Sequence, residues 1–273
     1  MTRKIQATIK TEINDGIALR AVENSIVVVG TYRGAVIDPE TETVTSTFGD
    51  GNSGGTGASR PVAFVGDAAF ELAGTGDLIE FDQLTATVTS VADLGVDTRG
   101  DKRRVKPTYP ITADGTSLFF SIHNGGDHLL SRYDVSTRAF TILHSVGDHV
   151  AIAVAGPTVW VLDTDRLLHG YDKVTGEPVT GVFELPRPDP PVASLDSADQ
   201  RALVVAADGT MWAIDQPSQI LYQLDPSTAQ VLSATHLKYR PNGLVVTDSA
   251  IWLTDTFDNR LTVIERSDLV PGS

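Results

Sequence analysis

The sequence predicts an all-β fold, a six-bladed β-propeller of four-stranded antiparallel blades, on three observations. The first is a repeated phrase in which an apolar strand, an Asp, a turn rich in Thr, Ser and Pro, and a further strand follow one another. The second is the repeat length of about 45 residues, which is typical of one blade. The third is that the copies account for the whole chain. Their acidic markers are Asp38, Asp82, Asp134, Asp172, Asp225 and Glu265.

Each copy begins with a short apolar segment that we assign as the innermost strand of its blade. The six first residues are Asp15, Arg60, Tyr109, His149, Arg201 and Asn242. They follow one another at spacings of about 40 to 52 residues, and about 46 residues run from Asn242 through the chain ends to Asp15. Because this wrap-around distance equals one repeat, we expect six blades and a single domain over residues 1–273.

The second strands read SIVVVG, AAFEL, SLFFSI, TVWVLD, TMWAID and AIWLTD. Trp160, Trp212 and Trp252 stand at matching positions in three of them, which favours packing between blades over a binding role. The recurrent Asp ends the third strand, and a Thr or Ser two or three residues later can bond its carboxylate in an Asx-type turn. Both features are therefore interpreted as structural.

The last blade lacks a clear fourth strand after Glu265. Residues 4–10, KIQATIK, resemble the strands that end the other copies. We predict that they pair with residues 261–265, complete the last blade and close the ring. Such pairing removes exposed strand edges that would otherwise invite aggregation.

Composition narrows the classes of partner and compartment. The chain carries a formal net charge of −14 and no cysteine. This charge argues against general nucleic-acid binding, because phosphate contacts need Lys and Arg, and the lack of Cys excludes disulfides and thiolate chemistry. No segment approaches the roughly 20 apolar residues of a membrane span, so no membrane partner is expected. The first residues lack the apolar core of a signal peptide, which predicts a cytoplasmic protein.

The loops divide into two sets according to the face of the propeller on which they lie. Loops that join first to second strands are short: VENS, VGD, ADG, AGP, ADG and TDS. The other set is long and irregular and includes residues 49–60, 94–109 and 184–201. Long loops on a rigid scaffold often carry binding sites, so we expect the functional site on the long-loop face. The alternative is that these loops are tolerated insertions.

The innermost strands should begin at the central channel on this face, so their first residues should surround its mouth. Arg60 and Arg201 suit a carboxylate or phosphate, which arginine can bind through two hydrogen bonds. His149 can transfer protons near neutral pH. The candidate catalytic residues are His149 and Asp15, and the candidate substrate-binding residues are Arg60, Tyr109, Arg201 and Asn242. The alternative is a water-filled funnel of mutually paired groups.

Over nearly the whole chain the repeat resembles the YncE-like and NHL-like propellers and the virginiamycin B lyase group. The phrase RPNGLVVTDSAIWLTD, residues 240–255, also resembles the SMP-30/gluconolactonase family of six-bladed lactonases. That resemblance implies a divalent cation such as Ca²⁺ in the channel, held by Asn242 of the PNG phrase and Asp15 of a DG phrase. The family's Glu ligand has no counterpart, since Thr108 and Tyr109 stand at its place. Ca²⁺ needs six to eight oxygens, so backbone or water would supply the rest.

Two further segments have a functional and a structural interpretation. His123, Asp127 and His128 lie on one hairpin tip and could bind a metal such as Zn²⁺, or residues 124–126 simply form a hairpin turn. The basic segment of residues 99–106, RGDKRRVK, either steers an anionic ligand toward the rim or is a plain solvated loop.

Two functions stay open at this point. One is a hydrolase or lyase, lactonase-like, acting on a small oxygen-rich or anionic substrate in the funnel; it predicts that His149→Ala lowers turnover while the fold survives. The other is a noncatalytic scaffold that recognises a protein or another ligand through the long-loop face; it predicts that neutralising residues 99–106 abolishes binding.

Overall fold

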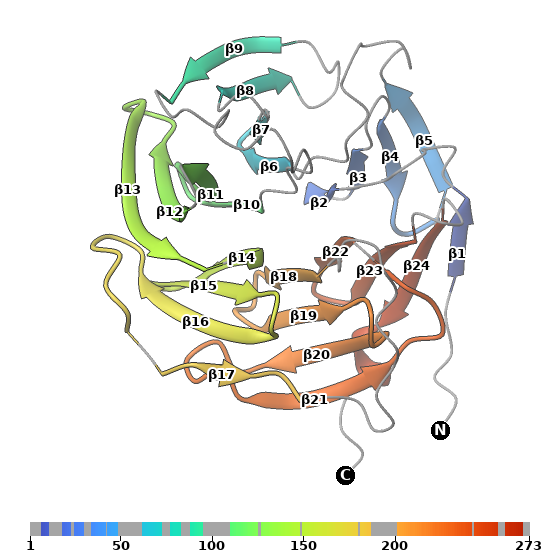
Figure 1. Cartoon of the computed structure of the whole chain (residues 1–273). Helices are drawn as coiled ribbons and strands as arrows, with labels where there is room; N and C mark the ends of the chain where they lie inside the picture. Colours follow the sequence, from blue (N-terminus) through green and yellow to red (C-terminus); the bar gives the residue numbers. More distant parts are fainter. Residues whose placement is uncertain are drawn as a thin grey trace. The chain divides into compact units, whose positions relative to one another are not determined.

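The computed structural model confirms the predicted fold class, an all-β six-bladed β-propeller (Figure 1). The structure describes residues 7–10, 18–22, 25–29, 34–41, 43–48, 62–72, 77–82, 88–94, 110–124, 127–147, 149–179, 181–186, 201–241, 243–255 and 260–269. The chain divides into two compact units, Met1–Ser53 with Phe183–Ser273 (unit 1) and Gly54–Val182 (unit 2). We describe each unit by itself.

Unit 1 contains three four-stranded antiparallel blades. Blade 1 consists of β2 (Ala18–Val22), β3 (Ser25–Val29), β4 (Gly34–Asp38) and β5 (Thr43–Phe48). Blade 5 consists of β18 (Arg201–Val205), β19 (Met211–Asp215), β20 (Ile220–Leu224) and β21 (Val231–His236). Blade 6 consists of β22 (Gly243–Val246), β23 (Ala250–Asp255), β24 (Arg260–Glu265) and β1 (Ala7–Lys10), and a 3-10 helix, η2 (Arg266–Leu269), follows it. The short strand β17 (Phe183–Glu184) also belongs to this unit. Innermost strand β22 contacts both β18 and β2.

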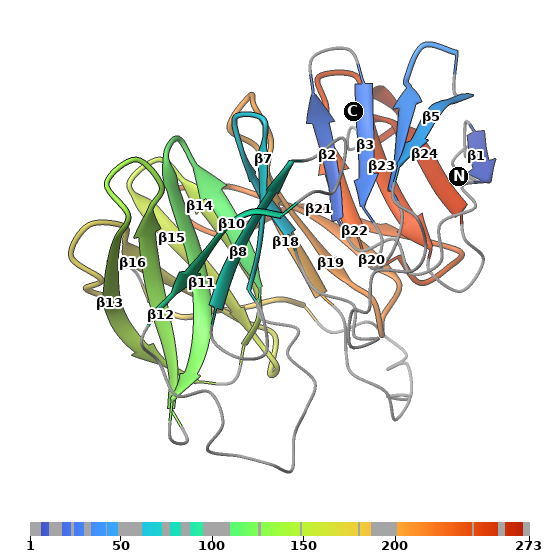
Figure 2. The same cartoon turned by 90° about the horizontal axis from the view of Figure 1, so that it is seen from above.

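Unit 2 contains the other three blades. Blade 2 consists of β6 (Val62–Val65), β7 (Ala68–Leu72), β8 (Asp77–Asp82) and β9 (Val88–Asp93). Blade 3 consists of β10 (Ile111–Asp114), β11 (Ser117–Asn124), β12 (Asp127–Asp134) and β13 (Ala139–Val146), the green strands of Figures 1 and 2. Blade 4 contains β14 (His149–Ala155), β15 (Thr158–Asp163) and β16 (Leu167–Asp172). Innermost strand β10 contacts both β6 and β14.

The N-terminal strand completes the last blade, as predicted. Strand β1 is antiparallel to β24, with Ala7 opposite Val263 and Lys10 opposite Arg260. The first strand of the chain therefore occupies the outer position of blade 6, and the edge of β24 is paired.

Apolar side chains fill the space between neighbouring blades within each unit. Trp252 of blade 6 is 1% exposed and packs with Ile26 and Ile37 of blade 1. Trp212 of blade 5 packs with Leu244 of blade 6 in a second cluster. An aromatic side chain buries about 200 Å², which stabilises the fold by roughly 5 kcal/mol at about 25 cal/mol per Å². The interpretation of these tryptophans as packing residues is confirmed.

Four of the six acidic markers stabilise the turns that follow their third strands, as the sequence predicts. Residues 83–87, after Asp82, lie outside the described residues, and η2 follows Glu265. The Asp134 carboxylate accepts hydrogen bonds from the Ser136 hydroxyl at 2.6 Å and from the Thr137 backbone N–H at 2.8 Å. These bonds, the Ser136 hydroxyl first, lower the pKa of Asp134 to about 2. Equivalent turns, also with a lowered pKa, occur at Asp38, Asp172 and Asp225. The repeat thus has a structural explanation.

Candidate functional site

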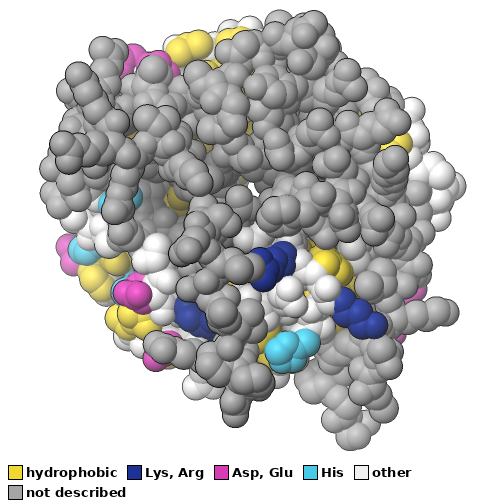
Figure 3. All heavy atoms as spheres, turned by 45° about the vertical axis from the view of Figure 1, so that its right-hand side comes forward, with side chains coloured by type: hydrophobic (Ala, Val, Ile, Leu, Met, Phe, Trp, Pro, Cys, Tyr) yellow, Lys and Arg dark blue, Asp and Glu magenta, His cyan; other side chains and the backbone are white. Residues whose placement is uncertain are grey.

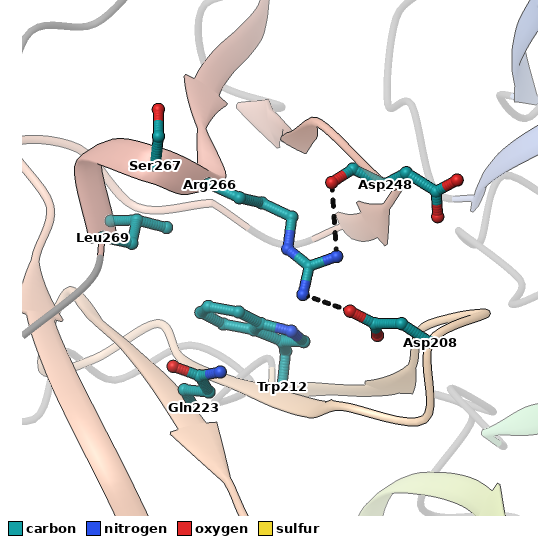
Figure 4. A pocket seen from close by; sticks show the side chains of 7 residues that line it. All are labelled: Asp208, Trp212, Gln223, Asp248, Arg266, Ser267 and Leu269. Atoms are coloured by element: carbon teal, nitrogen blue, oxygen red, sulfur yellow. Dashed lines mark hydrogen bonds and ion pairs between the residues drawn. The ribbon is translucent and has the colours of Figure 1, made fainter.

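A pocket of about 420 Å³ opens in unit 1 where blades 5 and 6 meet (Figure 4). Its residues come from the β18–β19 turn, from strands β19 and β20, from the β22–β23 turn and from η2. They are Asp208, Trp212, Gln223, Asp248, Arg266, Ser267 and Leu269. Five of these seven side chains carry polar groups and two are mainly apolar, a mixture common in binding sites.

The 3-10 helix η2 positions the central residue of the pocket, Arg266. In the last copy of the repeat the marker is Glu265, and the chain continues into η2 rather than into an Asx turn. The Arg266 backbone N–H donates to the Ser249 carbonyl at 2.9 Å. Leu269, 1% exposed, anchors the other end of η2 in the cluster between blades 5 and 6. These contacts direct the Arg266 side chain over Trp212 (Figure 4).

The Arg266 guanidinium is held by contacts on three sides. Its Nη2 lies 2.5 Å from Asp208 Oδ2 and 3.3 Å from Thr210 Oγ1, and its Nη1 donates to the Thr247 carbonyl at 3.2 Å. Its central carbon lies 6.0 Å from the centre of the Trp212 ring, which is within cation–π range. The Arg266 side chain is 17% exposed. Its position is therefore set before any ligand arrives.

Asp208 is a fixed anion at neutral pH. Its Oδ1 accepts hydrogen bonds from the Thr210 hydroxyl at 2.7 Å and from the Thr210 backbone N–H at 3.0 Å. The Thr210 hydroxyl, followed by the backbone N–H and Arg266, lowers the pKa of Asp208 to about 2 against the opposing effect of burial. A carboxylate with this pKa is a weak base, and it holds no proton to donate near neutral pH.

The other pocket residues differ in how they are engaged. Ser267 donates from its hydroxyl to Glu265 at 3.3 Å, and the Gln223 side-chain oxygen accepts from Ser233 at 3.4 Å. Figure 4 shows the Asp248 carboxylate directed away from Arg266, which contacts only its backbone carbonyl, at 3.5 Å. Asp248 therefore presents a carboxylate at the rim of the pocket.

Unit 2 repeats the same ion pair at the equivalent position of the repeat. Lys173 Nζ lies 2.6 Å from Asp114 Oδ2 and joins blade 4 to blade 3. Asp114 and Asp208 both stand in an Ala-Asp-Gly turn between first and second strands, and Lys173 and Arg266 both directly follow the acidic marker of the next blade. The ion pair thus occurs in two copies of the repeat, and in the second of them η2 adds Ser267 and Leu269 to the pocket.

Sequence reasoning missed this pocket because it lies on the short loops. Asp208 belongs to an ADG loop and Asp248 to the TDS loop, both in the set expected to be plain. One signal was present in the sequence: a basic residue follows the marker in each blade that comes directly after a blade with an ADG turn. Those basic residues are Lys173 and Arg266.

The structure describes two of the predicted site residues, and only their backbone. His149 begins β14 opposite Asp163, and Arg201 begins β18 opposite Asp215, so both start innermost strands as predicted. Asp15, Arg60, Tyr109 and Asn242 lie outside the described residues, as do residues 49–60 and 99–106. The catalytic, substrate-binding and metal roles assigned to these residues stay predictions.

The hairpin interpretation of the third blade agrees with the backbone. Strands β11 and β12 are antiparallel, with His123 opposite His128 and Asn124 opposite Asp127. Within the described ranges, no group of three or more His, Cys, Asp or Glu side chains is placed to hold a metal ion.

Among the described residues, no helix is long and apolar enough to cross a membrane. On the face shown in Figure 3, the Lys and Arg side chains of these residues lie as separate groups rather than as one patch. That distribution, like the net charge of −14, gives no footprint for a nucleic-acid backbone on the described part of this face.

Comparison with known proteins supports the fold and assigns no family. No protein-family model matches the chain, and no curated protein matches it. Among solved structures, BamB from Moraxella catarrhalis is similar with a TM-score of 0.52 over 93% of this chain and 85% of that chain, at 13% sequence identity. A likeness at this identity shows a shared β-propeller fold alone. The resemblances to the YncE-like, NHL-like, virginiamycin B lyase and SMP-30/gluconolactonase proteins stay predictions.

The predicted channel cation can be tested by thermal melting. After EDTA treatment, addition of Ca²⁺, Mg²⁺, Mn²⁺ or Zn²⁺ at about 100 times its Kd should stabilise a metal-binding chain by roughly 2.7 kcal/mol. For a chain of this size the melting temperature rises by about 2–4 °C for each kcal/mol of added stability. If Asp15 and Asn242 hold the ion, Asp15→Ala and Asn242→Ala should abolish the shift. An unchanged melting temperature with all four ions would contradict the lactonase-like metal site.

Proposed function

We propose that this protein is a noncatalytic recognition scaffold that binds a protein partner. The observation that supports this most is the pocket in unit 1, whose charged centre is already neutralised and held in place. Arg266 is bonded to Asp208, to Thr210 and to the Thr247 carbonyl. Rigid binding groups lose little conformational entropy when a partner binds, so they favour recognition.

The residue types of the pocket suit recognition better than chemistry. Arginine is enriched among the residues that contribute most to protein–protein binding, and Arg266, whose side chain is 17% exposed, lines the pocket. A general acid or base is most effective with a pKa near the working pH, whereas the hydrogen bond from Thr210 and the contacts after it lower the pKa of Asp208 to about 2. Of the catalytic candidates, only His149 has a described backbone, at the start of β14 in unit 2.

The proposal is tested by finding and reconstituting the partner. Proteins cross-linked to the chain in cells that express it are identified by mass spectrometry, purified, and titrated against the pure chain by calorimetry. We expect at least one of them to bind the isolated chain with a defined stoichiometry. The same preparation, assayed with a panel of lactones and sugar acids, should show no turnover above that of buffer.

Two results would contradict the scaffold. One is that no cross-linked protein binds the chain once both are pure. The other is turnover of a lactone or related substrate that His149→Ala abolishes while the melting temperature is unchanged, which would support the hydrolase or lyase hypothesis instead.

A further inference from the structure

The connection from blade 5 to blade 6 carries positive charge on an acidic chain. It runs from the end of β21 to the start of β22 (Figure 1). Residues 236–241 read HLKYRP and include no acidic residue. We call the side chains of His236, Lys238 and Arg240 the cationic strip. The chain as a whole has 35 acidic against 21 basic residues, so this connection departs from the composition around it.

The residues between the members of the cationic strip hold its backbone in place. Leu237 is 7% exposed, and its backbone N–H donates to the Gln219 carbonyl at 2.7 Å. Tyr239 packs against the apolar cluster between blades 5 and 6. The three side chains of the strip itself are exposed or partly exposed. The strip is therefore accessible on a backbone that is already fixed, which lowers the entropy lost when a partner binds.

No described acidic group compensates the charge of the strip. Within the described ranges, the side chains of Lys238 and Arg240 take part in no hydrogen bond or ion pair. The turn that Leu237 bonds to, residues 216–219, reads QPSQ and carries no charge, and Asp215 before it is 0% exposed. The cations of the two blade-to-blade ion pairs, in contrast, are each bonded to an aspartate.

Two uncompensated cations on a fixed backbone select an anionic occupant. An arginine guanidinium binds a carboxylate through two parallel N–H groups, and a lysine ammonium acts as a point charge. Lys238 and Arg240 are two residues apart, which separates their backbones by at most about 7 Å. Carboxylates at alternate positions of an extended chain are also about 7 Å apart. One acidic segment can therefore engage both cations at once.

A nucleic acid fits the strip less well than an acidic protein segment. Single strands are bound with the help of exposed aromatic faces on which bases stack, whereas Tyr239 packs against the apolar cluster. A continuous phosphate backbone would also extend from the strip over a chain of net charge −14, which repels it. A segment in which carboxylates alternate with neutral residues carries less charge across that surface.

We infer that the cationic strip binds an acidic segment of the protein partner, with one carboxylate at Lys238, another at Arg240, and the His236 ring as a further hydrogen-bond donor. The inference rests on the proposed recognition function and adds to it a second contact of stated chemistry. The strip precedes β22 and the pocket lies at the turn that follows β22, so the two contacts lie at opposite ends of that strand. The strip belongs to the long-loop face, where the sequence predicts the functional site.

The test is an NMR titration of the whole ¹⁵N-labelled chain with short peptides. The reporters are the backbone amides of Leu237, Lys238 and Arg240. The probes are N-acetylated, C-amidated peptides Gly-X-Gly-X-Gly-X-Gly in which X is Glu, Gln or Lys, so that the Glu peptide presents carboxylates at alternate positions. We expect the Glu peptide to shift the reporters saturably and the Gln and Lys peptides to leave them unchanged. Sodium chloride at about 0.5 M should weaken binding of the Glu peptide.

Matched variants locate the charge that is recognised. Lys238→Gln and Arg240→Gln should each weaken binding of the Glu peptide by about 1.5- to 5-fold, the range of one exposed ion pair, and the double variant should weaken it further. Arg138→Gln is the control and should leave binding unchanged. Arg138 is exposed in the turn after β12, and within the described ranges its side chain has no hydrogen bond or ion pair. Equal melting temperatures of the variants and the unmodified chain confirm that the fold is intact.

Three results with the peptides would overturn the inference: no saturable shift with the Glu peptide, an equal shift with the Gln peptide, or unchanged affinity in the double variant. Two further probes test other anions. Tighter binding of a thymidine tetranucleotide, whose three phosphates match the three carboxylates, would indicate a nucleic-acid site instead. Tighter binding of inorganic phosphate alone would indicate a small-anion site.

These results are distinct from failure of the scaffold. If the reconstituted partner binds the unmodified chain and the double variant equally well, recognition stands and the cationic strip is not its site. If no partner can be reconstituted, the scaffold fails whatever the peptides do.

Discussion

Replacing Gly176 with alanine is expected to lower the free energy of unfolding by about 2–4 kcal/mol. Gly176 has φ +77°, a conformation that side chains disfavour. An added Cβ would meet the Leu143 carbonyl group of β13, with its carbon at 2.7 Å, and backbone cannot move aside cheaply. Backbone strain of about 1 kcal/mol and overpacking of about 1–3 kcal/mol combine. The melting temperature, measured by circular dichroism, should fall by roughly 4–16 °C.

Gly156→Ala is the matched control for this prediction. Gly156 also has a positive φ, +57°, and nothing lies within 4 Å of its added Cβ. Its substitution should cost only the backbone strain, about 1 kcal/mol. Equal melting temperatures for the two variants would mean that the close approach of blade 4 to blade 3 at Leu143 adds nothing to the loss of stability in Gly176→Ala.

Arg266→Met is expected to destabilise the chain by about 1–2 kcal/mol. Methionine keeps the apolar stem over Trp212 and removes the charge that Asp208 and the Thr247 carbonyl contact. An exposed ion pair contributes about 0–1 kcal/mol and a broken buried pair about 3–5 kcal/mol. Arg266 and Asp208, with side chains 17% and 38% exposed, lie between these limits. A urea titration with Asp208→Asn and the double variant measures the coupling.

Lys173→Met is the control at the same position of the repeat. Lys173 and Asp114 are more open, with side chains 32% and 41% exposed, so their pair should contribute less than about 1 kcal/mol. If the two methionine variants lose equal stability, the burial of Arg266 and its contact with Trp212 add nothing to the free energy of unfolding.

The pH dependence of the Arg266 effect follows from Asp208. The Thr210 hydroxyl, and after it the Thr210 N–H and Arg266, lower the folded pKa of Asp208 from 3.8 to about 2. The stabilisation by this carboxylate, of which Arg266 supplies a part, is therefore fully present above about pH 4 and is lost as the pH falls through about 2. The difference in melting temperature between the unmodified chain and Arg266→Met should stay constant from about pH 7 to 5 and narrow by about pH 2.5. If the difference in melting temperature stays constant down to about pH 2.5, the Asp208 carboxylate is not the partner through which Arg266 stabilises the chain.

The repeat predicted the blades because its signals are local. In four blades the Asp at the end of the third strand bonds groups only two or three residues away, as at Asp134 with Ser136 and Thr137. The alternation of the strands and the spacing of the copies needed no knowledge of distant residues. The pairing of β1 with β24 is long-range, yet it could be predicted, because one blade lacked a strand and one strand lacked a blade.

The pocket could not be predicted in the same way. Arg266 and Asp208 are 58 residues apart and Lys173 and Asp114 are 59 apart, so neither pair has a local pattern. Leu269 and Trp212 share one packed cluster only because η2 replaces the last Asx turn and packs against blade 5. The sequence shows each of these residues in its own turn or strand, and the neighbouring blade decides which of them meet.

By itself, then, the sequence determined the all-β class, the six blades, the turns capped by the Asp markers and the strand that completes the last blade. These follow from short-range hydrogen bonding and from the period of the chain. Only the tertiary structure decided that Asp208, Trp212 and Arg266 meet in one pocket beside Asp248. The reason is physical: side chains on adjacent blades meet through packing and charge, which depend on position in space rather than on order along the chain.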